Sequence, residues 1–138
     1  MEYPIKAKCP CGQVSYQLYQ APAKVIACHC RECQKLSSAP FSVTAFVAAD
    51  QIKFTGTMHE TRRVADSGRE NVGVFCPDCG VRIYQYDPQN PSMVKLKLKP
   101  VGSDVDPLFE PQAHIWTSEK QAWFTLPDGV KSFDKAPS

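Results

Sequence analysis

The amino-acid sequence predicts an all-β protein with little helix, built as a single domain over residues 1–138. Three observations indicate this fold class. Several segments alternate apolar and polar residues, or are rich in β-branched and aromatic residues, as strands are. Proline and glycine, present in 12 and 7 copies, lie mainly between these segments, where turns are expected. No segment shows a sustained helical repeat of apolar residues.

Alternation is clearest in two of the predicted strands. Residues 13–19 alternate polar and apolar side chains. Residues 94–99 do the same, which places Val94, Leu96 and Leu98 on one face and three lysines on the other. Four further strands are predicted from their β-branched and aromatic residues, at 41–47, 52–55, 81–86 and 122–126.

Between the predicted strands, the sequence allows only short irregular or helical segments. A short helical turn is expected after Cys33 or near residues 104–110, and a loop is expected at residues 87–92. The two tryptophans, Trp116 and Trp123, are expected in the core, because large aromatic side chains bury much apolar surface.

Length and charge limit the class of function. A chain of 138 residues can form one domain with a substantial core. The formal net charge of +2 counts every cysteine as neutral, and seven metal-bound thiolates would make the chain net negative even with two Zn²⁺ ions bound. Because there is also no dense basic run, we expect no nucleic-acid partner. We expect no membrane partner and a cytoplasmic location, since the sequence shows neither a membrane-spanning apolar run nor a signal-peptide core.

Seven cysteines lie in three short clusters, and their spacing predicts metal binding. The clusters are Cys9-Pro-Cys11, Cys28-His-Cys-Arg-Glu-Cys33 and Cys76-Pro-Asp-Cys79. Short loops can aim two sulfurs at one ion when the cysteines are one or two residues apart. Thiols stay reduced in the cytoplasm, so clustered cysteines there favour metal over disulfide bonds. We therefore predict Zn²⁺ as the cofactor, with two ions per chain.

The most economical partition places the seven cysteines in one closed and one open site. Cys28, Cys30 and Cys33 (the three-cysteine cluster) lie within six consecutive positions, so one local loop can hold an ion. Three protein ligands leave one tetrahedral position of zinc for water or substrate, which is typical of catalytic zinc. We predict these three residues as the catalytic ones. A structural ion would be held by the remaining four, the four-cysteine cluster: Cys9, Cys11, Cys76 and Cys79.

Other interpretations fit the same spacing. The chain could bind a single structural zinc and leave three thiols idle, or bind two structural zincs with the second completed by a histidine or a carboxylate. A redox role for the Cys-x-x-Cys pairs is a further interpretation, although no βαβ pattern surrounds either pair. An iron–sulfur cluster is also compatible with the spacing.

The three histidines are weaker candidates for the site. In an extended segment alternate side chains point the same way, so Cys28 and Cys30 converge while His29 points elsewhere. We expect His29 beside the metal ligands rather than among them, and His114 as a packed strand residue. His59 is a candidate only because histidine titrates near neutral pH.

The cysteine clusters and their flanks resemble the glutathione-dependent formaldehyde-activating (GFA) family, which also includes centromere protein V. The resemblance covers nearly the whole chain, and the order of its cysteine motifs is specific. Its C-terminal part rests on Asp106-Pro, His114-Ile-Trp116 and the stretch from Trp123 to Gly129. The other matching segments are Cys9-Pro-Cys-Gly-Gln-Val14, Cys28-His-Cys-Arg-Glu-Cys-Gln-Lys35, Asp66-Ser-Gly-Arg69 and Phe75-Cys-Pro-Asp-Cys-Gly80.

This resemblance implies a β-tent fold of antiparallel sheets stapled by zinc. It also implies a structural role for the four-cysteine cluster and an active-site role for the three-cysteine cluster. The activity it implies is that of a carbon–sulfur lyase, which joins glutathione and formaldehyde to S-hydroxymethylglutathione and catalyses the reverse. The implied partners are therefore a small-molecule thiol, glutathione, and a small aldehyde.

The residues are compatible with such chemistry. A thiol that binds zinc loses its proton for the same reason as a cysteine ligand, and the thiolate is the nucleophile towards an aldehyde carbon. Alternatively, the metal would bind and polarise an aldehyde oxygen or water. Arg31 lies between Cys30 and Cys33, Lys35 follows the three-cysteine cluster, and both could meet the carboxylates of a glutathione-like substrate. The alternative function is a non-catalytic, zinc-stabilised binding or scaffold module.

Overall fold

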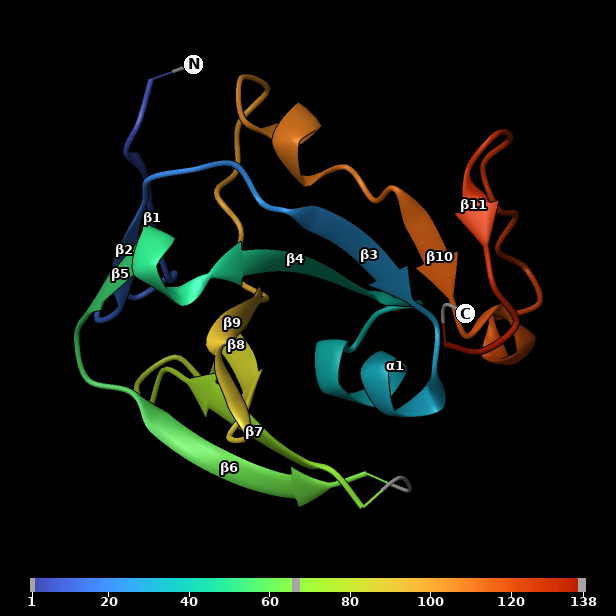
Figure 1. Cartoon of the computed structure of the whole chain (residues 1–138), viewed down its shortest axis with the longest axis horizontal. Coiled ribbons are helices and arrows are strands. Elements are labelled where there is room, and N and C mark those ends of the chain that lie inside the picture. The colour runs from blue at the N-terminus through green and yellow to red at the C-terminus, as the bar shows by residue number, and fades with distance from the viewer. Residues whose placement is uncertain (1, 66–67, 137–138) are drawn as a thin grey trace. The chain divides into compact units, whose positions relative to one another are not determined.

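The computed structural model describes residues 2–65 and 68–136 and shows a mostly β protein (Figure 1). This confirms the fold class expected from the sequence. Within the described residues no helix is both long and apolar enough to cross a membrane. The elements in chain order are β1 (Ile5–Lys8), β2 (Ser15–Leu18), β3 (Lys24–Cys28), α1 (Arg31–Ser37), β4 (Ser42–Ala48), η1 (Ala49–Gln51), β5 (Ile52–Thr55), β6 (His59–Val64), β7 (Glu70–Phe75), β8 (Arg82–Asp87), β9 (Asn90–Leu96), η2 (Asp106–Phe109), β10 (Ala113–Ile115), η3 (Thr117–Glu119) and β11 (Lys131–Ser132).

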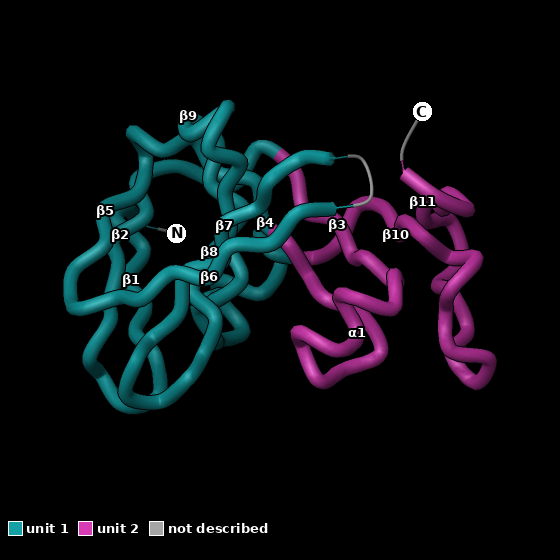
Figure 2. The backbone as a smooth tube through the Cα atoms, turned by 90° about the horizontal axis from the view of Figure 1, so that it is seen from below, with its two compact units in different colours: residues 1–23, 45–109 teal, residues 24–44, 110–138 magenta. Residues whose placement is uncertain are grey.

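The chain divides into two compact units, each built from two chain segments (Figure 2). Unit 1 comprises residues 1–23 and 45–109, and unit 2 comprises residues 24–44 and 110–138. The four-cysteine cluster belongs to unit 1 and the three-cysteine cluster to unit 2. Each candidate site therefore lies inside one unit. The single domain expected over residues 1–138 stays a prediction.

Unit 1 is built from antiparallel strands. A small sheet has the strand order β1-β2-β5. Residues 45–48 of β4, then β9, β8, β7 and β6, follow one another as hydrogen-bonded neighbours, while residues 42–44 of β4 belong to unit 2. Alternation places Tyr16 and Leu18 of β2 in the core, where they are 2% and 0% exposed. Val94 and Leu96 of β9 are buried in the same way, as the sequence predicted. The period-two pattern thus identified the buried faces of these two strands.

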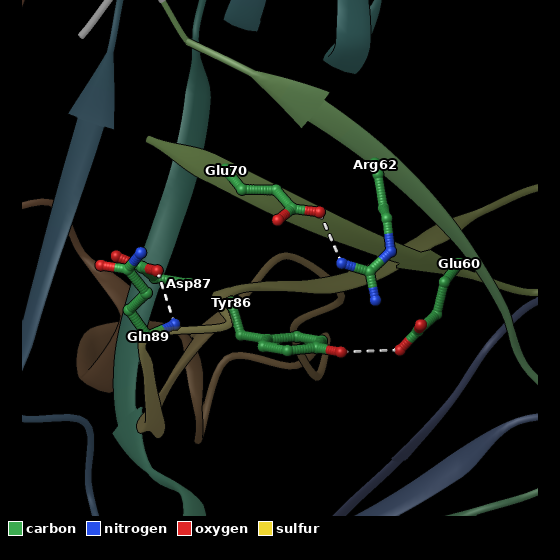
Figure 3. Close-up of polar contacts among 6 residues, drawn as sticks. All are labelled: Glu60, Arg62, Glu70, Tyr86, Asp87 and Gln89. Carbon is green, nitrogen blue, oxygen red and sulfur yellow. Dashed lines mark hydrogen bonds and ion pairs between the residues drawn. The ribbon is translucent and has the colours of Figure 1, made fainter. Parts of the chain in front are cut away.

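The link between β8 and β9 differs from the prediction. Residues 87–92 were expected to form a loop, but β8 runs to Asp87 and β9 begins at Asn90, opposite it in the register. The Gln89 backbone N–H donates to Asp87 Oδ1 at 2.9 Å and fixes a tight turn (Figure 3). The loop prediction was wrong for Asp87 and for residues 90–92, because strand pairing holds these residues despite their low strand propensity.

Polar cross-strand contacts hold β6 to its neighbours (Figure 3). Arg62 forms an ion pair with Glu70 of β7, and the Tyr86 hydroxyl of β8 donates to Glu60 at 2.9 Å. β6 lies at the end of the strand order and its side chains are largely exposed, so its charges discourage pairing with another chain. The sequence did not predict β6, because it carries almost no apolar residues to alternate.

Unit 2 contains β3, β10, β11 and α1. β10 pairs in parallel with both β3 and β11, an arrangement that the sequence did not predict. The register places Ile115 opposite Cys28, at the start of the three-cysteine cluster. The short helical turn expected after Cys33 is confirmed, because Cys33 lies in the first turn of α1.

The strand predicted at residues 122–126 is absent. These residues form a turn and an irregular segment. The Phe124 backbone N–H donates to the Gln121 carbonyl at 3.1 Å, and the Phe124 carbonyl accepts a hydrogen bond from Lys120 Nζ at 2.7 Å. Because local partners satisfy these backbone groups, strand pairing is not needed here, and the aromatic content of the segment misled the prediction.

Candidate metal centres

The structure brings together the four cysteines of unit 1 that the sequence paired. Their sulfur atoms all lie within 4.8 Å of one another. The Sγ atoms of Cys9 and Cys11 are 3.7 Å apart, and those of Cys11 and Cys76 are 3.6 Å apart. Four sulfurs around a tetrahedral zinc, with Zn–S distances of about 2.3 Å, lie about 3.8 Å from one another. The cluster could therefore hold such an ion, and its cysteines are free thiols.

Two loops with matching backbone hydrogen bonds present these sulfurs. The Cys9 N–H donates to the Val14 carbonyl, and the Cys76 N–H donates to the Val81 carbonyl, both at 2.9 Å. Each loop is thus closed across five residues. The Val14 N–H also donates to Cys9 Sγ at 3.3 Å, and such a donor favours the thiolate form.

A glycine follows the last cysteine of each loop and allows its turn. Gly12 has a φ of 83° and Gly80 has a φ of 77°, a left-handed conformation that suits glycine. In the second loop the Cys79 N–H donates to Cys76 Sγ at 3.5 Å. The loops therefore direct backbone N–H groups towards sulfur, as thiolate ligands require.

The four sulfurs differ in burial, and the pKa values of Cys9 and Cys11 are shifted in opposite directions. Cys9 and Cys76 are 1% and 0% exposed, whereas Cys11 and Cys79 are exposed. Burial raises the pKa of Cys9, but hydrogen bonds from the Val14 N–H and the neighbouring thiols outweigh it and lower the pKa to about 6. At Cys11 a backbone hydrogen bond lowers the pKa, but desolvation and the neighbouring thiols raise it to about 12. A cation among the sulfurs would relieve this competition for protons.

The link between β5 and β6 packs tightly against the first cysteine loop. Gln13 Nε2 donates to Asp78 Oδ2 at 3.0 Å and joins the two loops, and Gln13 Oε1 accepts from the Thr57 N–H at 3.1 Å. Gly56 has a φ of +115°, and a Cβ there would lie 2.0 Å from the Gln13 carbonyl oxygen. Only glycine permits this approach of the two backbones.

We expect Gly56→Ala to destabilise unit 1 and to weaken metal binding at the four-cysteine cluster. The added Cβ must move the Gln13 backbone, and alanine is strained at this φ. The expected loss in the free energy of unfolding is at least about 2 kcal/mol, measured by urea denaturation. Gly68→Ala is the matched control, because Gly68 has a φ of +85° with no atom within 4 Å of its Cβ position. Equal losses in both variants would contradict the role given to the close contact.

The cysteines of unit 2 also converge. The sulfurs of Cys28, Cys30 and Cys33 all lie within 4.8 Å of one another. Cys28 ends β3, and Cys30 is the N-cap of α1, where its sulfur accepts a hydrogen bond from the Cys33 N–H at 3.2 Å. In residues 2–65 and 68–136, no histidine, aspartate, glutamate or further cysteine joins this group. The cluster could therefore hold a metal ion with three protein ligands.

Crowding shifts the acidity of these thiols. Hydrogen bonds with Cys30 and Cys33, followed by burial, raise the pKa of Cys28 far above its usual value. At Cys30 the hydrogen bond with Cys28 lowers the pKa, but the bond with Cys33 and burial outweigh it, so the pKa is raised. Without a metal, Cys28 and Cys30 thus keep their protons at neutral pH. A bound metal must displace those protons, and its affinity should fall as the pH falls.

Residues from the other segment of unit 2 hold this loop in place. The His29 N–H donates to the Ile115 carbonyl of β10 at 3.0 Å. Gln34 Nε2 donates to the His29 carbonyl at 2.7 Å and to the Glu119 carbonyl at 2.9 Å. The loop that carries the three sulfurs is therefore fixed by both β10 and a side chain of α1.

His29 lies between two of the cysteines in sequence but outside their group of sulfurs, as the alternation predicted. It is fully buried, its Nε2 lies 2.8 Å from His114 Nδ1, and its ring packs on Phe41 and Phe124. Burial, followed by the charges of His114 and Lys120, lowers the pKa of His29. Burial also lowers the pKa of His114, which is the packed strand residue expected from the sequence. Both rings therefore favour the neutral form.

Two features of unit 2 were missed or misjudged in the sequence. Trp123 was expected in the core, but it is 68% exposed. The contacts that link Gln34 to Gln121 join residues 87 positions apart, and no spacing signal could have found them. Two residues of one GFA-like motif, Asp66 and Ser67, lie outside the described residues.

These observations define a class: a small, mostly β protein with two cysteine clusters, each of which could hold a metal ion. The chain matches the family model described as "Glutathione-dependent formaldehyde-activating enzyme" over residues 4–119, a range that contains all seven cysteines. The protein therefore belongs to the GFA family, as its motifs predicted.

Comparison with solved structures gives three matching chains. One of them is a crystal structure of a Rhodobacter sphaeroides protein, with a TM-score of 0.54 and 19% sequence identity. The match covers 78% of this chain and 97% of that chain. At this level of identity it supports the fold alone. A comparison with curated proteins found no match.

Proposed function

We propose that this protein is a zinc-dependent carbon–sulfur lyase that joins a small aldehyde to a thiol and splits the adduct. Glutathione is the proposed thiol, formaldehyde the aldehyde and S-hydroxymethylglutathione the adduct. The observation that carries the proposal is the three-cysteine cluster, which combines three converging sulfurs with no fourth protein ligand in the described part of the chain. Membership of the GFA family supports the choice of substrates.

The donor atoms fit zinc at both clusters. Thiolates are preferred zinc ligands. In the four-cysteine cluster the sulfur–sulfur distances of 3.6 and 3.7 Å suit a tetrahedral ion, and in the three-cysteine cluster the sulfurs lie within 4.8 Å of one another. In this proposal the four-cysteine cluster holds a structural ion, and Cys28, Cys30 and Cys33 hold a catalytic one. Zinc bound there supplies a position that accepts sulfur or oxygen from a substrate and lowers the pKa of a thiol.

The reaction balances without a redox partner. A bond forms between the thiol sulfur and the aldehyde carbon, and the thiol proton ends on the aldehyde oxygen, which becomes a hydroxyl group. The protein residues keep the site in place while this happens. The Cys33 N–H donates to the Cys30 sulfur, and the rings of His29 and His114, whose pKa values burial lowers, contact each other in the interior.

Metal stoichiometry and thiol binding test the proposal. We expect two zinc ions per chain, and a mild chelator should first remove the ion held by three protein ligands. In the cobalt-substituted protein, glutathione should change the visible spectrum through a new sulfur ligand. If both ions resist the chelator and no thiol changes the spectrum, the chain is a zinc-stabilised binding or scaffold module instead.

A cytoplasmic location belongs to the same proposal. The seven cysteines are free thiols in the structure, and metal-binding thiols persist in a reducing compartment. Fractionation of cells that produce the protein, followed by immunodetection, would test the location directly. Recovery from an oxidising compartment would contradict it.

A further inference from the structure

A pocket of about 490 Å³ lies beside α1 in unit 2. This volume falls within the range of roughly 300–1,000 Å³ that small-molecule sites occupy. Two of the lining residues, Arg31 and Gln34, directly follow Cys30 and Cys33 in the chain, so the pocket adjoins the three-cysteine cluster. We call it the α1 pocket. Its polar and aromatic lining residues are Arg31, Gln34, Lys35, Ser38, Gln121 and Trp123.

A chain of hydrogen bonds fixes one wall of the α1 pocket. Trp123 Nε1 donates to Gln121 Oε1, and Gln121 Nε2 donates to Gln34 Oε1 at 3.1 Å. Gln34 Nε2 donates in turn to the carbonyl of His29 at 2.7 Å. His29 lies between Cys28 and Cys30 in the chain. An indole that is 68% exposed is thereby held in one place and connected to the cysteine loop.

Two cations line the same pocket. Arg31 and Lys35 are four residues apart on α1, so their side chains lie on the same face of the helix. Both are exposed, and among residues 2–65 and 68–136 neither forms an ion pair. The carboxylate of Glu119 accepts a hydrogen bond from the Arg31 backbone N–H at 2.8 Å, but neither Glu119 nor Glu32 lines the pocket. The pocket thus offers positive charge without a lining acid.

We infer that the α1 pocket binds the carboxylate-bearing part of the thiol substrate and so selects acidic thiols over neutral ones. Arg31 and Lys35 would contact a carboxylate, and the fixed face of Trp123 would cover the aliphatic and amide parts next to it. The inference rests on the proposed function, because it assigns the pocket to the substrate of the three-cysteine cluster. It adds the residues that would determine which thiol is accepted.

Binding of S-methylglutathione tests this inference separately from the binding of a thiol to the metal. This ligand keeps both carboxylates of glutathione but has a thioether in place of the thiol. The zinc-loaded full-length protein should show a saturable change in tryptophan fluorescence on titration. The protein has two tryptophans, so loss of the change in Trp123→Phe would assign it to the pocket. The diethyl ester of the same ligand should bind at least about tenfold more weakly, because its carboxylates are masked.

Charge variants localise the binding. Arg31→Ala and Lys35→Ala should each raise the dissociation constant for S-methylglutathione by about tenfold, as expected for loss of a charge-assisted contact. Lys131→Ala is the matched control, because Lys131 is an exposed lysine of unit 2 that does not line the pocket. High salt should weaken binding to the wild type and have less effect on the two pocket variants.

The outcomes separate this inference from the proposed function. If small neutral thiols change the cobalt spectrum but S-methylglutathione does not bind, or binds equally to Arg31→Ala, Lys35→Ala and Lys131→Ala, the inference is overturned and the proposed function stands. If S-methylglutathione binds through the two cations but no thiol reaches cobalt, the proposed function fails. The assignment of the pocket to its substrate then fails as well.

Discussion

Cys79→Ser should unfold unit 1. Cys79 brings the second cysteine loop to the sulfurs of the first, across a separation of 65 residues between Cys11 and Cys76. Metal binding at such a site contributes directly to folding, with apparent free energies of about 10–16 kcal/mol for structural zinc in peptides. This is similar in size to the whole free energy of unfolding of a domain, roughly 5–15 kcal/mol. Far-UV circular dichroism and zinc analysis of the purified variant would measure the loss.

Asp78→Ala provides the control for this variant. Asp78 lies in the same loop, and its one side-chain hydrogen bond within residues 2–65 and 68–136 is the exposed one from Gln13 at 3.0 Å, so its loss should leave the protein folded and zinc-loaded. A Cys79→Ser protein with wild-type spectrum and stability would contradict a structural role for the four-cysteine cluster. Unfolding in both variants would show that the loop is sensitive to any change.

Cys30→Ser should give a folded protein that lacks the second metal ion and the activity. The three-cysteine cluster is local, spanning residues 28–33, so its loss should not open a long-range connection. Serine can also keep the N-cap role of Cys30, because a hydroxyl oxygen accepts the hydrogen bond from the Cys33 N–H. We expect a change in the free energy of unfolding within about 1 kcal/mol and loss of all metal-dependent turnover.

The measurement must allow for the spontaneous reaction of thiols with formaldehyde. Exchange between glutathione and S-hydroxymethylglutathione can be followed by NMR with and without protein, at equal substrate concentrations. The wild type should exceed the protein-free rate, and Cys30→Ser should equal it. Ser37→Ala, which changes another residue of α1, should keep both the metal and the activity. If Cys30→Ser and Cys79→Ser unfold to the same extent, the division of roles between the clusters is wrong.

The strands that could be predicted are those that place one face in the core and the other face towards solvent, because their sequences alternate apolar and polar residues. Residues 52–55 were predicted with the bounds that β5 has, and the alternation of Val94 and Leu96 gave their burial in β9. β6 shows why another strand could not be predicted. β6 has almost no apolar residues, and its strand conformation depends on pairing with β7, which no local preference encodes.

The candidate sites also divide into contacts within a short segment, which could be predicted, and contacts between distant segments, which could not. Cys28, Cys30 and Cys33 could be assigned to one cluster from spacing alone, because a six-residue loop limits how far their sulfurs can separate. The partner of His29 could not be predicted, because His114 is 85 positions away in the chain. The pairing of β3 with β10 brings the two histidines together. The exposure of Trp123 was misjudged for a related reason. Its indole N–H bonds to Gln121 at the rim of a pocket that only the folded chain creates.

Cysteine spacing alone identified the side chains that could bind metal and grouped them into two sets, because coordination by neighbouring cysteines is a property of short loops. The meeting of the loops at residues 9–11 and 76–79, with two sulfurs in the core and two exposed, depends on long-range packing. The same long-range packing sets what surrounds the three-cysteine cluster: a buried histidine pair and a pocket lined by two cations and an indole. These neighbours come from distant parts of the chain, and strand pairing and packing, rather than local residue preference, bring them together.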